Sequence, residues 1–254
     1  MAEWTLEGKV AIVTGGGGSG LGRALALRIA RDGAGVVVAD VDEAGGAETG
    51  RRIEEAGGRA AFIRTDVTAE RDLEAAVAFA EEIFGGLDVL VNNAGGTPKP
   101  HFPEAPIAHW SPILDLNLRG PMMAIQHSLP AMARRGGGAV VNIASVAGLG
   151  YAHHSSPEYS AAKAGLIRLT ATLGLLAERS GVRVNCIVPN WIGTEEVRAE
   201  IEAMSPEERA EVPDVLTTPE EIADLAVDLI EDESLAGRVV VWWTTKEPEL
   251  LPAE

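Results

Sequence analysis

The chain has 254 residues, 46% of them hydrophobic and 23% charged, which is typical of one or two compact soluble domains. This composition excludes a disulfide miniprotein or a disordered tail, and the single cysteine, Cys186, allows no internal disulfide. The formal charge of −17 disfavours nucleic-acid binding, which usually needs a basic patch. No apolar run reaches the roughly 18 residues of a membrane span, and no basic signal region opens the chain. We therefore expect a soluble cytoplasmic protein with no nucleic-acid and no membrane partner.

Short apolar runs alternate with helical patterns from the first residues onward. Runs at 9–14, 36–40, 60–64 and 87–91 are typical of buried strands. Helical spacing follows the first run at 21–33 and the second at 41–56, and a third helix carries Leu73, Val77, Ala80 and Phe84 on one face.

The second half continues this alternation and adds acidic helices. A long helical region at 107–135 contains Pro121 and Pro130, which are expected to bend it. Another helix should follow Pro157, and capping boxes at 205–208 and 218–221 open two acidic helices. Further strands are expected at 139–143, 182–188 and 238–242. The pattern predicts an α/β fold, a doubly wound Rossmann-type three-layer sandwich with a seven-stranded parallel sheet, as a single domain over residues 1–254.

Negative charge is concentrated in the last quarter of the chain. Residues 195–254 hold 18 acidic and 4 basic side chains. Most of these acids are expected on solvated helix faces. The segment at about 194–216 is also a candidate for a small acidic lid that would disfavour anionic substrates.

A glycine-rich turn between the first strand and helix points to a dinucleotide. Gly20-Leu21-Gly22 opens the helix at 21–33, where backbone N–H groups can approach a pyrophosphate. Asp40 lies 18 residues beyond Gly22, at the end of the next strand, where a carboxylate can accept both ribose hydroxyls and repel a 2′-phosphate. The alternatives are a plain tight turn and a helix-capping aspartate. We predict NAD rather than NADP as cofactor.

Tyr159 and Lys163 are spaced for acid–base catalysis. They share one helical face, so the ammonium can stabilise a phenolate whose ordinary pKa is about 10. Ser156 and Pro157 are expected to cap this helix, which would place Tyr159 in its positive first turn; both effects should lower the tyrosine pKa. Ser145, after the strand at 139–143, can hydrogen-bond a substrate oxygen. The alternatives are an exposed helical pair and a solvated turn serine.

Several segments together resemble the short-subunit branch of the short-chain dehydrogenase/reductase family, from about residue 7 to about residue 241. They are Thr14–Gly22, Asp66-Val67, Asn92–Gly95, Asn117, Ser145 and Tyr159–Lys163. The resemblance implies that Gly15, Ser19, Gly20, Leu21 and Gly22 form the phosphate turn. It also implies that Asp66 and Val67 contact adenine, that Asn93 and Ala94 line the cofactor floor, and that Pro189, Ile192 and Thr194 flank the nicotinamide carboxamide.

The resemblance further implies a proton path and an assembly. Asn117 would hold a water, so that protons pass from the substrate oxygen through Tyr159, a ribose hydroxyl and Lys163 to that water; the alternative is a helix asparagine bonded to backbone. A homotetramer is expected because family members commonly form one.

Three positions depart from the family pattern. The glycine turn is one residue longer, because Gly16, Gly17, Gly18 and Ser19 stand where three residues are usual. Asn190 replaces a glycine, and is expected to keep the turn because asparagine tolerates left-handed backbone. Trp242 and Trp243 replace an Asp-Gly-Gly ending, and fill either the pocket floor or an interface.

The remaining candidates carry weaker signals. His153 and His154 are interpreted as surface histidines, although their loop should border the substrate. Cys186 is expected in the core, and no His, Cys or acidic spacing indicates a metal site. The stripe Leu166, Leu169, Leu173 and Leu176 indicates core or subunit interface. Substrate contacts are expected from the loops at 96–105, 146–156 and 190–216.

These observations predict an NAD(H)-dependent oxidoreductase that interconverts a secondary alcohol and a ketone. Its small-molecule substrate is expected to be neutral. One alternative is an NADPH-dependent ketone reductase, in which Arg23 or Arg64 would meet the 2′-phosphate. The other is a non-catalytic dinucleotide sensor on the same fold.

Overall fold

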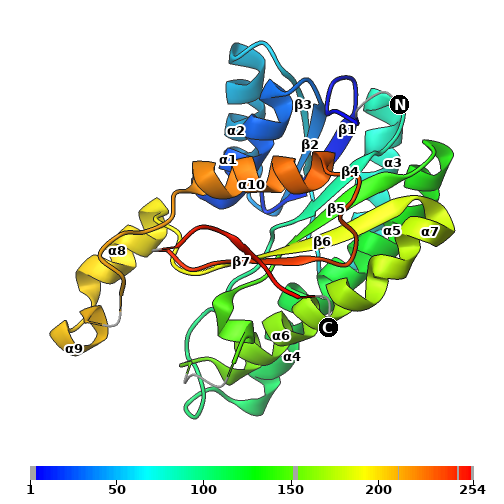
Figure 1. Ribbon diagram of the computed structural model, residues 1–254. Coiled ribbons are helices and arrows are strands. Elements are labelled where there is room, and N and C mark those ends of the chain that lie inside the picture. The colour runs from blue at the N-terminus through cyan, green and yellow to red at the C-terminus, as the bar shows by residue number, and fades with distance from the viewer. Residues whose placement is uncertain (1–3, 151–153, 211, 245, 253–254) are drawn as a thin grey trace.

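The computed structural model describes residues 4–150, 154–210, 212–244 and 246–252, and shows a twisted sheet between two layers of helices (Figure 1). The side chains of Glu207 and Glu208 also lie outside the description. His153, which was interpreted as a surface histidine, lies outside the described residues.

The strands run through the middle of the molecule in the order β3-β2-β1-β4-β5-β6-β7-β8. Their bounds are β1 Val10–Thr14, β2 Gly35–Asp40, β3 Arg59–Arg64, β4 Val89–Asn92, β5 Gly138–Ile143, β6 Val182–Pro189, β7 Val239–Trp242 and β8 Glu249–Leu250. The first seven pair in parallel, so the predicted fold class is confirmed.

The count of seven strands is wrong by one. β8 pairs antiparallel with β7 through only two residue pairs, Val240 with Leu250 and Val241 with Glu249. Two exposed residues carry no alternation of apolar and polar side chains, so a periodicity argument cannot detect such a strand.

Successive side chains of each buried strand point to opposite faces of the sheet and fill cores on both. Val13 and Val38 belong to the core that faces the first layer of helices, whereas Ile12 and Val37 belong to the core that faces the second layer, where a further cluster includes Leu166 and Cys186. The first layer comprises α1 Leu21–Arg31, α2 Glu43–Glu55 and α10 Pro219–Glu231, and the second comprises α3 Glu70–Phe84, α5 Gly120–Arg134, α6 Pro157–Thr172 and α7 Leu176–Ser180 (Figure 1). Within the described ranges, no helix combines the length and apolar character needed to cross a membrane.

The region predicted as one bent helix is divided into four pieces. A 3-10 turn at Ile107–His109 leads into α4 Trp110–Leu114, a π-helical turn at Asp115–Arg119 follows, and α5 then starts. Pro121, in the first turn of α5, has no N–H for the usual bond to residue 117, which favours a wider turn at this point. The π turn places Asn117 in the interior, fully buried.

Helix starts agree in part with the expected capping. Thr218 and Glu221 form the predicted reciprocal capping box of α10. Ser156 and Pro157 occupy the predicted cap and first-turn positions of α6, but the Ser156 hydroxyl makes no capping bond. It accepts a hydrogen bond from the Thr97 hydroxyl at 2.8 Å instead, which ties α6 to the loop after β4.

Candidate active site

A pocket of about 520 Å³ opens at the carboxyl ends of the strands, where parallel sheets place their ligands. It brings together eight residues that were predicted from the sequence: Leu21, Asn93, Ser145, Tyr159, Lys163, Pro189, Ile192 and Thr194. They come from helix starts and strand ends spread over most of the chain. Of the other predicted residues, Asn117 and Ala94 lie beside this pocket, Gly15, Ser19, Gly20, Gly22 and Asp40 lie along the glycine turn, and Asp66 and Val67 follow β3.

Tyr159 and Lys163 lie on one face of α6, as their spacing predicted. The Lys163 ammonium lies 5.5 Å from the centre of the Tyr159 ring and donates to the Ile143 carbonyl at 2.9 Å. Burial lowers the pKa of Lys163 to about 8. Ser145 forms a hydrogen bond with Tyr159 and accepts one from the Ala147 amide at 3.2 Å, so its hydroxyl is fixed beside the phenol.

The expected lowering of the Tyr159 pKa is wrong for these surroundings. Burial raises the pKa of Tyr159, and the hydrogen bond with Ser145 opposes this only in part. The first turn of α6 and the Lys163 ammonium do not turn this rise of the Tyr159 pKa into a fall. The phenol is removed from water, and the ammonium is bonded to the Ile143 carbonyl.

Asn117 is close to Lys163 but is bonded to backbone. A Cβ built on Gly95 would lie 2.8 Å from the Asn117 carbonyl oxygen and 3.2 Å from the Lys163 nitrogen, so both side chains flank this glycine. The Asn117 amide donates to the carbonyls of Gly96 at 2.8 Å and Ile113 at 3.0 Å, and accepts from Gly96 N–H at 3.1 Å. The asparagine thereby fixes the loop that forms one wall of the pocket.

The glycine turn is packed so closely that side chains cannot replace two of its glycines. Gly15 has a positive φ of 68°. A Cβ on Gly22 would lie 1.9 Å from the Gly15 carbonyl oxygen. Asn93 donates from its amide to the carbonyls of Thr14 and Gly15 at 3.0 and 3.1 Å, and Ala94 N–H donates to the Thr14 hydroxyl at 3.2 Å. Both predicted floor residues therefore secure the turn from β4.

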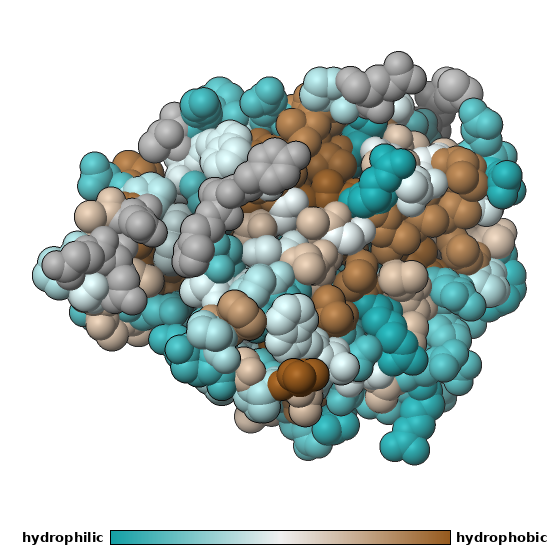
Figure 2. Space-filling model, turned by 90° about the horizontal axis from the view of Figure 1, so that it is seen from below, coloured by the Kyte–Doolittle hydropathy of each residue, from teal (hydrophilic) through white to brown (hydrophobic). Residues whose placement is uncertain are grey.

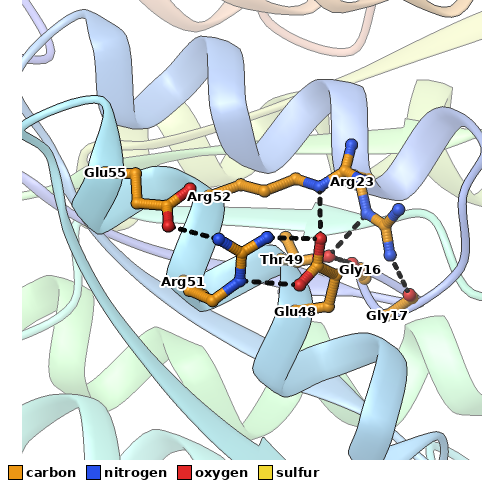
Figure 3. A network of polar contacts seen from close by, with 8 residues as sticks. All are labelled: Gly16, Gly17, Arg23, Glu48, Thr49, Arg51, Arg52 and Glu55. Carbon is orange, nitrogen blue, oxygen red and sulfur yellow. Dashed lines mark hydrogen bonds and ion pairs between the residues drawn. The ribbon is translucent and has the colours of Figure 1, made fainter.

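A second set of bonds holds the lengthened part of the turn from the side of α1 and α2 (Figure 3). The buried Thr49 hydroxyl donates to the Gly16 carbonyl at 2.8 Å, and Arg23 donates to the Gly17 carbonyl at 3.0 Å and to Thr49 at 2.9 Å. We call Arg23 and Thr49 the brace of the turn. Because carbonyl and N–H point in opposite directions across a trans peptide, the brace turns the Gly18 N–H away from α2.

Asp40 completes this arrangement at the end of β2. Its carboxylate accepts from Gly17 N–H at 2.7 Å and from Asp42 N–H at 2.9 Å. A Cβ on Gly17 would lie 2.9 Å from the Asp40 carboxyl carbon, so the extra residue of the turn has to be small. Asp66 accepts from Thr68, and Val67 is buried beside it.

The residues along this edge fit a bound dinucleotide. Gly20 starts α1 with no side-chain capping bond, so no protein side chain competes for the first amides of the helix. A Cβ on Gly18 would meet no atom closer than 4.0 Å, so this glycine borders open space. The turn, the helix start and the pocket form one continuous edge from Asp40 to Tyr159.

Comparison with known proteins agrees with this site. Residues 9–205 match the family model described as short chain dehydrogenase. The chain belongs to the short-chain dehydrogenase/reductase family.

Several relatives in this family are named as dehydrogenases of hydroxylated compounds. The chain is 40% identical to cis-4-hydroxycyclohexanecarboxylate dehydrogenase of Sinomonas cyclohexanicum, over 88% of this chain and 90% of that one. It is 35% identical to cyclohexanol dehydrogenase of an Acinetobacter species, over 89% of each. A solved 7α-hydroxysteroid dehydrogenase complexed with NADH and 7-oxo glycochenodeoxycholic acid has a TM-score of 0.84 and 30% identity, covering 94% of each chain. The family shows that this chain is an oxidoreductase for CH–OH groups that uses a nicotinamide dinucleotide and a small-molecule substrate.

The predicted lid residues follow β6 in this short-chain dehydrogenase. They form α8 Glu195–Ala203 and α9 Pro206–Arg209, which project from the body of the molecule beside the pocket (Figure 1). Thr194 caps α8 by accepting from Val197 N–H at 3.2 Å, and the Ser19 hydroxyl donates to Glu196 at 3.4 Å. These contacts link the glycine turn to the start of the lid segment.

The expected left-handed backbone at Asn190 is wrong. In the described residues every positive φ belongs to a glycine. Asn190 N–H donates to the Trp242 carbonyl at 3.0 Å, and its side-chain amide donates to the Thr244 hydroxyl at 3.2 Å. The turn is held by these bonds and needs no unusual backbone conformation.

Other undecided side chains now have defined places. Trp243 lines the pocket, whereas Trp242 packs against the core under α10. The prediction that Cys186 is a core residue is confirmed, and burial raises the pKa of its thiol to about 12. Leu166 is buried, and the rest of its stripe packs partly buried against the same side of the sheet.

Two residues of the pocket wall come from loops that were expected to contact the substrate, but neither was predicted individually as a site residue. His154, from the loop at 146–156, and Trp191, from the loop at 190–216, line the pocket, and His154 is half-buried there, not on the surface as expected. Its ring stacks on that of Tyr159, with ring centres 5.7 Å apart. The only signal in the sequence was the position of His154 in a loop between two predicted site residues.

One further polar cluster lies away from the pocket. Glu70 and Glu74 of α3 approach His127 of α5, with ligand-type atoms within 4.8 Å of one another. Each imidazole nitrogen faces a different carboxylate, at 3.3 and 3.7 Å, so the cluster joins α3 to α5 by polar contacts. The absence of a metal site stays a prediction.

Proposed function

We propose that this chain is an NAD(H)-dependent dehydrogenase that interconverts a secondary alcohol and a ketone, with Tyr159 as acid and base. The observation that carries the proposal is the shared pocket in which Tyr159 meets Ser145, the Lys163 amine and the cofactor-flanking residues Ile192 and Thr194. A nicotinamide ring bound at this wall would supply the acceptor or donor of the hydride.

The chain's own residues account for the proton. The raised pKa of Tyr159 keeps the phenol protonated near neutral pH, which is the form that donates to a ketone oxygen. Ser145, hydrogen-bonded to the phenol, would hold the substrate oxygen in line with it. In the oxidation direction Tyr159 must receive the alcohol proton, and a charged Lys163 beside the ring would favour its phenolate. Asn117 would support this arrangement by holding the loop at Gly96.

Preference for NAD over NADP is supported by charges at the end of β2. Asp40 would repel a 2′-phosphate. The two arginines that could bind that phosphate are engaged: Arg23 in the brace, and Arg64 near Glu43 and Asp72 at 3.9 and 3.8 Å. An NADPH enzyme would need to release one of them.

The pocket wall supports a cyclic substrate with no charge near the reacting carbon. Val146, Ala147, Leu149 and Trp191 contribute apolar surface, and acidic α8 lies beside the mouth. The cyclohexanol and hydroxycyclohexanecarboxylate dehydrogenases named above act on ring alcohols, as their names state. We therefore propose a ring alcohol without an anionic group near the reacting carbon.

We also propose that the chain assembles with copies of itself, as a tetramer. The side of α4 and α6, seen from below in Figure 2, carries apolar surface in its middle, framed by hydrophilic side chains. Phe102, Ile107 and Trp110 are exposed large apolar residues in this part of the chain. Sedimentation analysis is expected to give a tetramer, and a monomer at all concentrations would refute this assembly.

Purified protein with cyclohexanol, and separately with NAD or NADP, tests the function. We expect NADH formation with NAD, and at least tenfold lower kcat/KM with NADP, since a 2′-phosphate opposite a carboxylate is a like-charge contact that costs several kcal/mol, and about 1.4 kcal/mol corresponds to tenfold. Preference for NADP would refute the assignment to Asp40. Tight NAD binding without hydride transfer to or from any of a broad set of alcohols and ketones would favour the dinucleotide sensor.

A further inference from the structure

His154 lies where two cavities meet. The pocket at Tyr159 is one, and the other, of about 940 Å³, is lined mainly by residues 99–104. His154 lines both cavities. Its ring stacks on the Tyr159 ring at an angle of 25°, so it covers one face of the phenol.

The hydrogen bonds of Ser156 fix which ring nitrogen of His154 carries the proton. Nδ1 lies 3.1 Å from the Ser156 amide nitrogen and 3.2 Å from the Ser156 carbonyl oxygen. That carbonyl already accepts from Ser160 N–H at 3.1 Å. The buried Ser156 N–H needs an acceptor, and Nδ1 provides it. Nδ1 is therefore the unprotonated nitrogen, and the proton is on Nε2.

Within the part of the chain that the structure describes, nothing accepts a hydrogen bond from the Nε2–H of His154, and Nε2 is not one of the enclosed side-chain atoms without a partner. It therefore faces accessible space at the junction of the two cavities, and Val146, Ala147 and Leu149 of the inner pocket wall offer only apolar side chains. A ligand that supplies an acceptor here gains a hydrogen bond that an unsubstituted ring cannot make.

We propose that His154 determines substrate specificity by donating from Nε2–H to a second oxygen on the ring alcohol whose reacting hydroxyl lies at Tyr159. The substrate class is then a neutral cyclic alcohol with a second hydroxyl or keto group, and the outer cavity receives that end of the ring. This inference rests on the proposed function, because it assigns the substrate of the same site.

The direct test compares cyclohexanol with 1,4-cyclohexanediol. One hydrogen bond is worth roughly 1 kcal/mol, so wild type should favour the diol about fivefold in kcat/KM per hydroxyl group. His154→Phe keeps an aromatic ring to stack on Tyr159 but removes the donor, so its ratio per hydroxyl group should fall to about one. His127→Asn is the control, because it replaces a histidine of α5 that contacts α3 and does not line the pocket. This variant should keep the wild-type ratio. An unchanged ratio in His154→Phe would overturn the proposal.

A binding measurement separates this inference from the proposed function. Trp191 and Trp243 line the pocket, so their fluorescence reports binding of cyclohexanone or 4-hydroxycyclohexanone with NAD present, a combination in which the ketone cannot be reduced. If the hydroxyketone binds more tightly and His154→Phe removes that difference, while no alcohol is oxidised, the specificity holds and the proposed function fails. If wild type and His154→Phe are both active, and each binds cyclohexanone and 4-hydroxycyclohexanone with the same affinity, the proposed function holds and the role of His154 is refuted. If His154→Phe does not fold, His154→Gln and His154→Met provide the same comparison. The two replacements are similar in size, but only the glutamine has an N–H donor.

Discussion

The brace behind the glycine turn is expected to set dinucleotide affinity without touching catalysis. Arg23 makes two bonds, to the Gly17 carbonyl at 3.0 Å and to Thr49 at 2.9 Å, and Thr49 in turn holds Gly16 (Figure 3). In Arg23→Ala both bonds are lost. The turn is rich in glycine, so its amides would then sample many other orientations.

The size of the effect follows from these bonds. A hydrogen bond from a charged donor contributes about 1.5–3 kcal/mol, and the lower value applies here because Arg23 is only partly buried. About 1.5 kcal/mol corresponds to roughly a tenfold rise in the Kd for NAD. The kcat should stay within about twofold of wild type, since Tyr159, Ser145 and Lys163 are untouched.

Calorimetric titration with NAD measures this Kd, and steady-state kinetics separate KM from kcat. Arg52→Ala is the matched control, because Arg52 lies in the same region of α2 but bonds only to Glu48 at 2.7 Å (Figure 3). Arg51 and Arg52 together lower the pKa of Glu48 to about 2, without contact to the turn. Equal NAD affinity in the two variants, or a loss confined to kcat, would refute the role assigned to the brace.

Three further changes test charge and packing. The pKa of Lys163 in the folded protein, about 8, lies below its ordinary value of 10.5, so the folded state binds fewer protons than the unfolded state between these values. The free energy of unfolding is measured in urea for wild type and for Lys163→Met at several pH values. The difference between the two proteins should rise by about 1.4 kcal/mol per pH unit from about pH 8 to 10. A difference that does not change with pH would contradict the burial of this amine. Asp40→Asn keeps an acceptor for Gly17 N–H but loses the charge, so the ratio of Kd values for NADP and NAD should fall about tenfold, whereas Asp42→Asn should leave it unchanged; equal ratios in both variants would count against Asp40. Leu90→Ala removes a fully buried side chain of β4 and should cost about 3 kcal/mol in urea unfolding, against less than about 1 kcal/mol for the exposed Leu175→Ala; similar losses would refute the assigned core.

Most of the sheet could be predicted because its strands are buried on both faces. Such strands appear in sequence as Val-rich runs next to a glycine, as at 9–14, which Gly15 follows, and at 36–40, which Gly35 precedes, and this local pattern survives folding. β8 and the π turn at Asn117 could not be predicted. β8 depends on where residues 249–250 fold back onto β7. Pro121 indicates a bend in the helical region, but a proline alone does not specify that the bend takes the form of a π turn at 115–119.

The pocket residues were predictable where strand ends and helix spacing determine their place, as for Ser145, Tyr159 and Lys163. Contacts between distant segments were not. Thr49 is 26 residues from Arg23, and nothing in either local sequence indicates that they meet. The sign of the Tyr159 pKa shift was also beyond the sequence, because it depends on how completely the fold removes the phenol from water.

Tyr159→Phe is the sharpest test of the proposed chemistry, because it removes only the hydroxyl that exchanges the substrate proton. NAD binding, followed by calorimetry, should stay within about twofold of wild type. Turnover of cyclohexanol should fall by about a thousandfold, the range expected for loss of a general acid–base group. Retention of even a tenth of wild-type turnover in a variant that binds NAD normally would show that Tyr159 is not the acid and base.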